Sequence, residues 1–264
     1  MTTMIDSRVS QARVVRSEWT KLWSLPSTVW SLLTAEVLIV GVGALYALLR
    51  VARPPRQPAD LSAFDPTAIS LTGVQLAQFA IGVLGVLLIT GEYATGTIRA
   101  SLAAVPRRLP VLWGKGIVVA LTTLGLCVPA TFAAFLVGQS ILSSEQLDTT
   151  LSHPGAARAV LGSALYLTAV GLLGLGLGAL SRATAGAISG LFGLLFAPQI
   201  VVDLLPSTLS DQIYKYLPAP AGVAITSARP DPTSLGPWAG FGLFCLYTAV
   251  VLGLAAGQLR RRDA

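Results

Sequence analysis

Acidic side chains inside apolar segments are the residues of this chain that are most able to do chemistry. Glu36 stands well inside the first long apolar run, and Asp203 stands near the end of the fifth. A carboxylate in hydrocarbon is costly and indicates a functional site by default. The place of Asp203 beside the end of its run predicts that water solvates it. Two interpretations stay open for Glu36, which either lines a substrate path or makes a structural hydrogen bond.

The motifs of the common catalytic and metal sites are missing from the sequence. Nothing fits GxxxxGK[ST], and the nearest stretch, Gly114-Lys115-Gly116, has neither the upstream glycine nor the hydroxyl residue that holds Mg²⁺. The single histidine, His153, offers too few ligands for haem or zinc. GxSxG, HExxH and paired aspartates inside apolar runs are absent. We therefore expect no catalytic residue, no metal and no cofactor in this chain.

The composition indicates a membrane protein. Of the 264 residues, 53% are hydrophobic and only 11% are charged, and the mean hydropathy is +0.71. A soluble domain carries about 25% charged residues. The apolar residues fall in runs of roughly twenty, the length that crosses a bilayer as a helix, and they lack the alternation of a transmembrane strand. The prediction is an all-α polytopic membrane protein that forms one transmembrane domain over residues 1–264.

Six segments are predicted to span the bilayer, and a seventh helix is predicted to lie on its surface. The spans are expected at residues 28–49, 69–90, 117–140, 159–180, 185–205 and 238–259. Residues 7–25 show an amphipathic pattern with two tryptophans, which is typical of an interfacial helix. Its apolar face is predicted to hold Val9, Ala12, Val15, Trp19, Leu22 and Trp23, with Val14 as an exception and Glu18 and Lys21 elsewhere. Residues 206–237 are predicted to form an outer loop that contains a short interfacial helix.

The basic residues predict the orientation. The net charge is +6, and most of the Lys and Arg side chains fall in the short connections on the side of both termini. Cytoplasmic loops are enriched in these residues, so both termini are predicted to be cytoplasmic, in the plasma (inner) membrane. Arg50, Arg53 and Arg56 in the first outer loop run against this rule. The same distribution explains the basic pI without a nucleic-acid partner.

The stretch GEYATGTIRASLAAVPRRLPVLWGK, residues 91–115, is the most charged interruption between two spans. Residues 91–116 are predicted to form a cytoplasmic connection in which Glu92 ends a span, Gly96 permits a turn and Thr97 caps a short helix. Ile98, Leu102 and Val105 would form one apolar stripe on that helix, and Pro106 would end it. A short amphipathic helix presented by two rigid spans is suited to dock in a groove of a partner.

These residues carry a resemblance to a known family. E-Y-x-x-G-T-I-R followed by L-A-A-V-P-R-R resembles the second-to-third helix connection of ABC-2 type transporter permeases, which have a type V exporter-like fold. S-E-W-T-K-L-W-S, from Ser17 to Ser24, resembles the interfacial connecting helix of actinobacterial members. Tyr216 to Ile225 resembles their outer loop. Length, number of spans and orientation fit along the whole chain.

The resemblance implies a function and a set of partners. It implies the membrane-spanning subunit of an ATP-binding cassette exporter, which pairs with a second permease subunit and docks on separate ATPase subunits that bind ATP and Mg²⁺. The coupling residues that it implies are Glu92, Gly96, Thr97, Ile98, Arg99, Leu102 and Val105. The same resemblance makes Glu92 a partner for basic groups at the boundary with the ATPase.

Two other functions remain open on the sequence alone. An ion-gradient-driven secondary transporter would also have six spans, although the two halves show no internal similarity and few polar residues lie in the membrane. A structural subunit of a membrane complex would explain the absence of catalytic motifs but not the loop at residues 91–116. The substrate, the direction of transport and the choice between homodimer and heterodimer are not readable from the sequence.

Overall fold

The computed structural model describes residues 11–54, 64–97, 109–229 and 233–261. Within those ranges every regular element is a helix, and six helical stretches are long and apolar enough to cross a membrane. The prediction of an all-α polytopic protein with six spans is confirmed. Ile98, Arg99, Leu102 and Val105, which carry the predicted docking stripe, lie outside the described residues.

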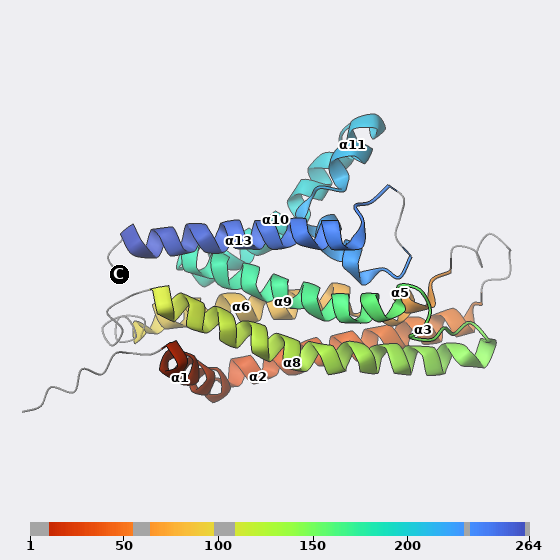
Figure 1. The fold of residues 1–264 in the computed structure, drawn as a ribbon, viewed down its shortest axis with the longest axis horizontal. Coiled ribbons are helices and arrows are strands. Elements are labelled where there is room, and N and C mark those ends of the chain that lie inside the picture. The colour runs from red at the N-terminus through yellow and green to blue at the C-terminus, as the bar shows by residue number, and fades with distance from the viewer. Residues whose placement is uncertain (1–10, 55–63, 98–108, 230–232, 262–264) are drawn as a thin grey trace, which may run out of the picture.

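The bundle consists of long helices that run roughly side by side (Figure 1). The first span, Pro26–Ala52, consists of α2 (Pro26–Val37), a π-helical turn (Leu38–Val42) and α3 (Gly43–Ala52). The other five spans are α6 (Val74–Thr95), α8 (Leu109–Leu142), α9 (Ala156–Ser181), α10 (Thr184–Asp203) and α13 (Pro237–Arg261). The shorter helices are α1 (Gln11–Ser24), α5 (Pro66–Ser70), α11 (Ser207–Tyr214) and α12 (Pro218–Val223), with 3-10 turns at Ser143–Glu145 and Ala224–Thr226.

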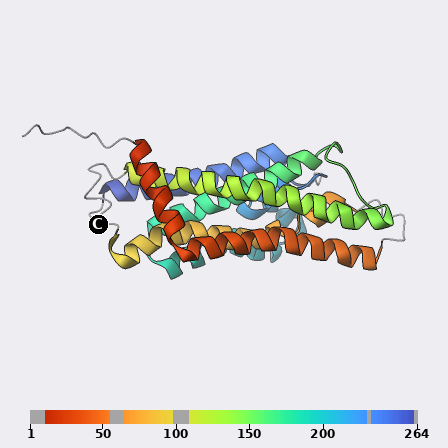
Figure 2. The same ribbon diagram turned by 90° about the horizontal axis from the view of Figure 1, so that it is seen from below.

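The two ends of the bundle are distinct. Helix α1, the end of α6, the start of α8 and the end of α13 gather at one end, called here the terminal end, while α5 and the start of α13 lie at the other, distal end (Figure 1). Figure 2 shows α1 crossing the neighbouring spans at a steep angle. Helix α1 is therefore a surface helix laid over the terminal end, and it does not continue the direction of the first span.

Helix α9 lies at the centre of the bundle, and it is the most deeply buried of the six spans. It packs on α6 by direct approach of backbones. A Cβ on Gly85 would collide with the carbonyl of Gly171, and one on Gly174 would collide with the carbonyl of Gly82. Small residues let membrane helices approach in this way. The glycine-rich run of α9 is thus used inside one subunit.

The connection between the second and third spans is shorter than the sequence predicted. Helix α6 continues to Thr95, and α8 begins at Leu109, so that Lys115 lies inside a helix and not in the loop of residues 91–116. The second span also begins later than residue 69. Residues 66–70 form the separate helix α5, and a turn at residues 71–73 divides it from α6. The Asp65 side chain sets the start of α5 by accepting hydrogen bonds from the backbone N–H groups of Thr67 and Ala68.

The loop of residues 206–237 carries two helices with different surroundings. On α11, Leu209 and Ile213 are exposed, and the helix projects away from the bundle (Figure 1). Helix α12 packs on α9 and α13, and Ala219, Ala221 and Gly222 are buried there. The short helix expected to rest at the outer interface is therefore partly built into the core.

Candidate functional site

Helix α1 is held firmly on the start of α8. Val14, Glu18 and Leu22 are its buried residues, and they follow one another at the i, i+4 spacing of one helix face. A Cβ on Gly114 would lie 2.9 Å from Cγ1 of Val14, so a glycine is needed for the two helices to meet so closely. The Gln11 side chain donates a hydrogen bond of 3.1 Å to the carbonyl of Pro110.

The face of α1 that packs on protein differs from the predicted apolar face. Val14, expected to break the pattern, is buried, while Trp19 and Trp23 are exposed, with their ring centroids 6.0 Å apart. Glu18, expected away from the apolar face, is among the most buried residues of the helix. The amphipathic pattern missed this because a charged residue is buried when a partner from another helix neutralises it.

Four charged side chains from three helices form one network at the terminal end. The Lys115 ammonium of α8 donates to Glu18 Oε2 of α1 at 2.6 Å and to Glu92 Oε1 of α6 at 2.8 Å. The Lys21 ammonium donates to Glu18 Oε1 at 2.8 Å and to the same Glu92 oxygen at 3.0 Å. Two cations and two carboxylates balance, so the network is neutral. It binds α1, α6 and α8 together at the point where the chain leaves α6 and returns in α8.

The network is largely withdrawn from solvent. The Lys115, Glu18 and Glu92 side chains are 4%, 6% and 13% exposed, whereas Lys21 is 40% exposed and forms the solvent side of the network. Burial by itself would lower the pKa of Lys21, but the hydrogen bonds to Glu18 and Glu92 outweigh it, and the pKa is raised above its ordinary value. Lys21 therefore stays charged at neutral pH.

One acceptor of the network is left open. Glu92 Oε2 is buried and makes no hydrogen bond to any described residue. A buried carboxylate oxygen without a donor costs free energy, and Glu92 sits directly before the turn into residues 98–108. The observation makes Glu92 the member of the network that is able to accept one more donor.

Neighbouring contacts tie the end of α6 to the rest of the terminal end. The Arg182 guanidinium, in the turn between α9 and α10, lies 5.6 Å from the ring centroid of Tyr93. Thr184, at the start of α10, donates a 3.0 Å hydrogen bond to the Thr90 hydroxyl. Gly96 then ends α6 with a φ of 72°, a left-handed conformation that glycine adopts without strain.

The structure describes three of the seven residues proposed for coupling. Of the residues proposed for coupling, Glu92 lies in the network, Gly96 ends α6, and Thr97 follows it with a 2.9 Å contact between its hydroxyl and that of Thr95. Glu18, Lys21 and Lys115 were not proposed. A signal was present for Lys115, since it is a lysine within a long apolar helix and such a residue needs a carboxylate partner.

Glu36, the other predicted site residue, lies apart from this network, in the α2 part of the first span. It is half-buried. No described residue makes a hydrogen bond or an ion pair with it. The π-helical turn Leu38–Val42 follows directly, a feature that is frequent at functional sites. Asp203 is exposed at the end of α10, and His153 is exposed in its loop.

Comparison with known proteins gives the site its context. A family model described as ABC-2 family transporter protein matches residues 58–264. This chain belongs to the ABC-2 transporter family. The matched part holds Glu92 and Lys115, while Glu18 and Lys21 precede it. A search of curated proteins gave no match.

As an ABC-2 family member, the chain is a multi-pass permease subunit of an ABC transporter. Such a subunit is not itself catalytic and works with ABC ATPase subunits. No group of three His, Cys, Asp or Glu side chains suitable for a metal ion occurs among the described residues. The charge network joins α1, α6 and α8 through ion pairs.

Proposed function

We propose that this chain forms the translocation path of an ATP-driven exporter, together with a second permease subunit, and that the terminal end receives force from two ATPase subunits that bind ATP and Mg²⁺. In this proposal both termini are cytoplasmic, in the plasma membrane. Residues 98–105 form the coupling helix, as the resemblance of Glu92, Gly96, Thr97, Ile98, Arg99, Leu102 and Val105 to the ABC-2 loop implies.

The observation that carries the proposal is the network of Glu18, Lys21, Glu92 and Lys115. Glu92 and Lys115 stand on the two helices that bracket residues 98–108. Ion pairs between them, and from both to α1, prevent these helix ends from moving independently. A push on the segment between them is then passed to α1, α6 and α8 as one body. Coupling of distant sites needs this kind of contiguous, rigid connection.

Glu36 is proposed to line the translocation path. Its charge is half-buried in the first span and has no hydrogen-bonding or ion-pairing partner among the described residues, which is costly unless a substrate or water uses it. The adjoining π-helical turn supports the same role. The nature of the substrate does not follow from this one carboxylate.

Co-purification tests the proposal first. The tagged protein is solubilised in mild detergent from its native host, and the proteins that remain bound are identified and quantified by mass spectrometry. We expect an ABC ATPase in stoichiometric amount. A chain that purifies alone, and that transports with an ion gradient but without ATP, would overturn the proposal in favour of a secondary transporter.

A matched pair of variants then tests the coupling segment. Leu102→Asp places a charge on the proposed docking stripe, where it would lose its water against an apolar groove. Leu209→Asp places the same charge on exposed Leu209 of α11, at the other end of the chain's membrane domain. We expect loss of the bound ATPase with Leu102→Asp only. Equal retention of the ATPase by both variants would remove residues 98–105 from the interface.

A further inference from the structure

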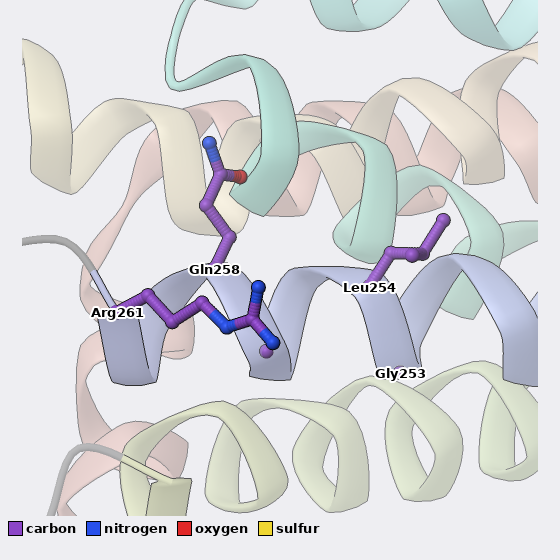
Figure 3. A pocket seen from close by; sticks show the side chains of 5 residues that line it. Gly253, Leu254, Gln258 and Arg261 are labelled. Carbon is purple, nitrogen blue, oxygen red and sulfur yellow. The ribbon is translucent and has the colours of Figure 1, made fainter.

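A groove opens on the last turns of α13, away from the charge network. It has a volume of about 420 Å³ and is lined by Gly253, Leu254, Gly257, Gln258 and Arg261. Figure 3 shows that the Arg261 side chain runs back along α13, so that its guanidinium lies beside the helix and does not extend beyond its end. The groove thus combines an apolar floor with one cation beside it.

The floor of the groove is open because two glycines form it. A Cβ on Gly253 or Gly257 would meet no atom within 4 Å. Gly174 in α9 is the opposite case, since the backbone of α6 fills the space beside it. The glycines of α13 are therefore not needed for packing against any described residue, and they leave a shallow channel along a span that is mostly exposed.

The charge at the groove favours an occupant that is not purely apolar. Arg261 is exposed and has no ion pair with any described residue, so its guanidinium is available to an anionic group. An apolar helix placed over the groove would reduce the hydration of the guanidinium without supplying a counter-charge, which is unfavourable. A ligand that complements the groove carries a negative charge beside an apolar part.

The depth of the groove in the bilayer matches a lipid. Helix α13 has 25 residues, and at about 1.5 Å per residue it spans the hydrocarbon with its last turn at the headgroup level. Leu254 and the glycine floor lie one to two turns deeper than Arg261. A phosphate at Arg261 would therefore place its acyl chain along Gly257 and Gly253.

We propose that this groove is a binding site for one anionic phospholipid of the leaflet at the terminal end. The guanidinium of Arg261 pairs with the lipid phosphate, and an acyl chain fills the channel over Gly253 and Gly257. Basic pockets beside transmembrane helices hold anionic headgroups in this manner. The proposal depends on the chain being a membrane protein and not on its proposed export function.

Native mass spectrometry of the purified protein tests the site. The protein is delipidated in detergent and titrated with phosphatidylglycerol or, as the uncharged comparison, phosphatidylcholine of the same acyl chains. We expect one tightly retained phosphatidylglycerol per chain. Arg261→Gln should reduce its retention at least fivefold, and Arg260→Gln, which changes the adjacent exposed arginine outside the groove, should reduce it less than twofold.

A variant that fills the floor of the groove tests the contact with the acyl chain separately from the contact with the phosphate. Gly257→Leu occupies open space and leaves Arg261 in place, so it should also abolish retention of the lipid while circular dichroism stays unchanged. A free phosphate source is tested by adding inorganic phosphate in excess, which should not displace the lipid.

Four results would overturn the proposal. The first is that Arg260→Gln reduces retention of phosphatidylglycerol as much as Arg261→Gln does. The second is that phosphatidylcholine is retained as well as phosphatidylglycerol, and the third is that inorganic phosphate displaces the bound lipid. The last is that Gly257→Leu changes the oligomeric state of the protein. The last result would mean that a second copy of the chain covers the groove. None of these results bears on whether the protein binds an ATPase.

Discussion

Lys115 is the residue whose replacement is expected to cost the most at the terminal end. It is 4% exposed and neutralises both Glu18 and Glu92. Lys115→Met would leave two carboxylates close together with only Lys21 to balance them, and removing one partner of a buried pair costs about 3–5 kcal/mol. The corresponding change at Lys21, which is 40% exposed, should cost much less because water screens it.

This comparison is measured by heating the detergent-solubilised protein with a thiol-reactive dye. Cys127 is buried and reports unfolding when it becomes labelled, and Cys245→Ala removes the second thiol. We expect the midpoint temperature of unfolding to fall by a large amount for Lys115→Met and by a small amount for Lys21→Met. Adding Glu18→Gln to Lys115→Met should recover part of the loss, since it removes one unpaired charge. Similar midpoints for both lysine variants would show that the network adds nothing to stability.

Glu36 offers a test of function against structure at the scale of one residue. Replacing a carboxylate that has a structural partner destabilises the fold, whereas replacing a functional carboxylate without a partner does not. Glu36→Gln should therefore keep or raise the midpoint of unfolding while it alters transport. Asp203→Asn is the control, and because Asp203 is exposed it should change neither. A midpoint lowered by Glu36→Gln would assign Glu36 a structural hydrogen bond.

At the scale of helices, the packing of α6 on α9 depends on backbone contact. Gly85→Ala would drive a Cβ into the backbone of Gly171, and overpacking of this kind costs about 1–3 kcal/mol. Gly91 lies on the same helix with nothing within 4 Å of its Cβ position. Gly91→Ala should therefore stabilise α6 by about 0.5–1 kcal/mol through helix propensity. The same thermal labelling of Cys127 measures both variants, and equal midpoints would refute the close approach of α6 and α9.

At the scale of the whole molecule, the charges predict the orientation in the membrane, and this orientation is open to direct measurement. Single cysteines are placed at exposed Ser17, on α1 at the terminal end, and at exposed Ser144, after α8 at the distal end, in a chain without Cys127 and Cys245. The positive-inside bias predicts that a membrane-impermeant maleimide labels intact cells at position 144 only. Labelling at position 17 only would invert the topology and place the proposed docking segment outside.

The sequence by itself determined that this chain is a helical membrane protein with six spans and that it resembles ABC-2 permeases. Both conclusions rest on local properties, namely the length of apolar runs and the short motif around Glu92 and Gly96, and neither requires knowledge of what packs on what. The family match over residues 58–264 and the six long helices agree with them.

Only the tertiary structure decided which charges meet and which glycines are covered. Glu18 and Lys115 stand 97 residues apart, and nothing in the periodicity of either segment specifies the other, since burial of an ion pair depends on a partner supplied by another helix. Gly174 and Gly257 likewise each belong to a GxxxG pattern, with Gly178 and Gly253 respectively. Helix α6 covers Gly174, whereas no described residue covers Gly257. Such a pattern indicates that a helix has a smooth surface, but only the tertiary structure shows which element packs on that surface.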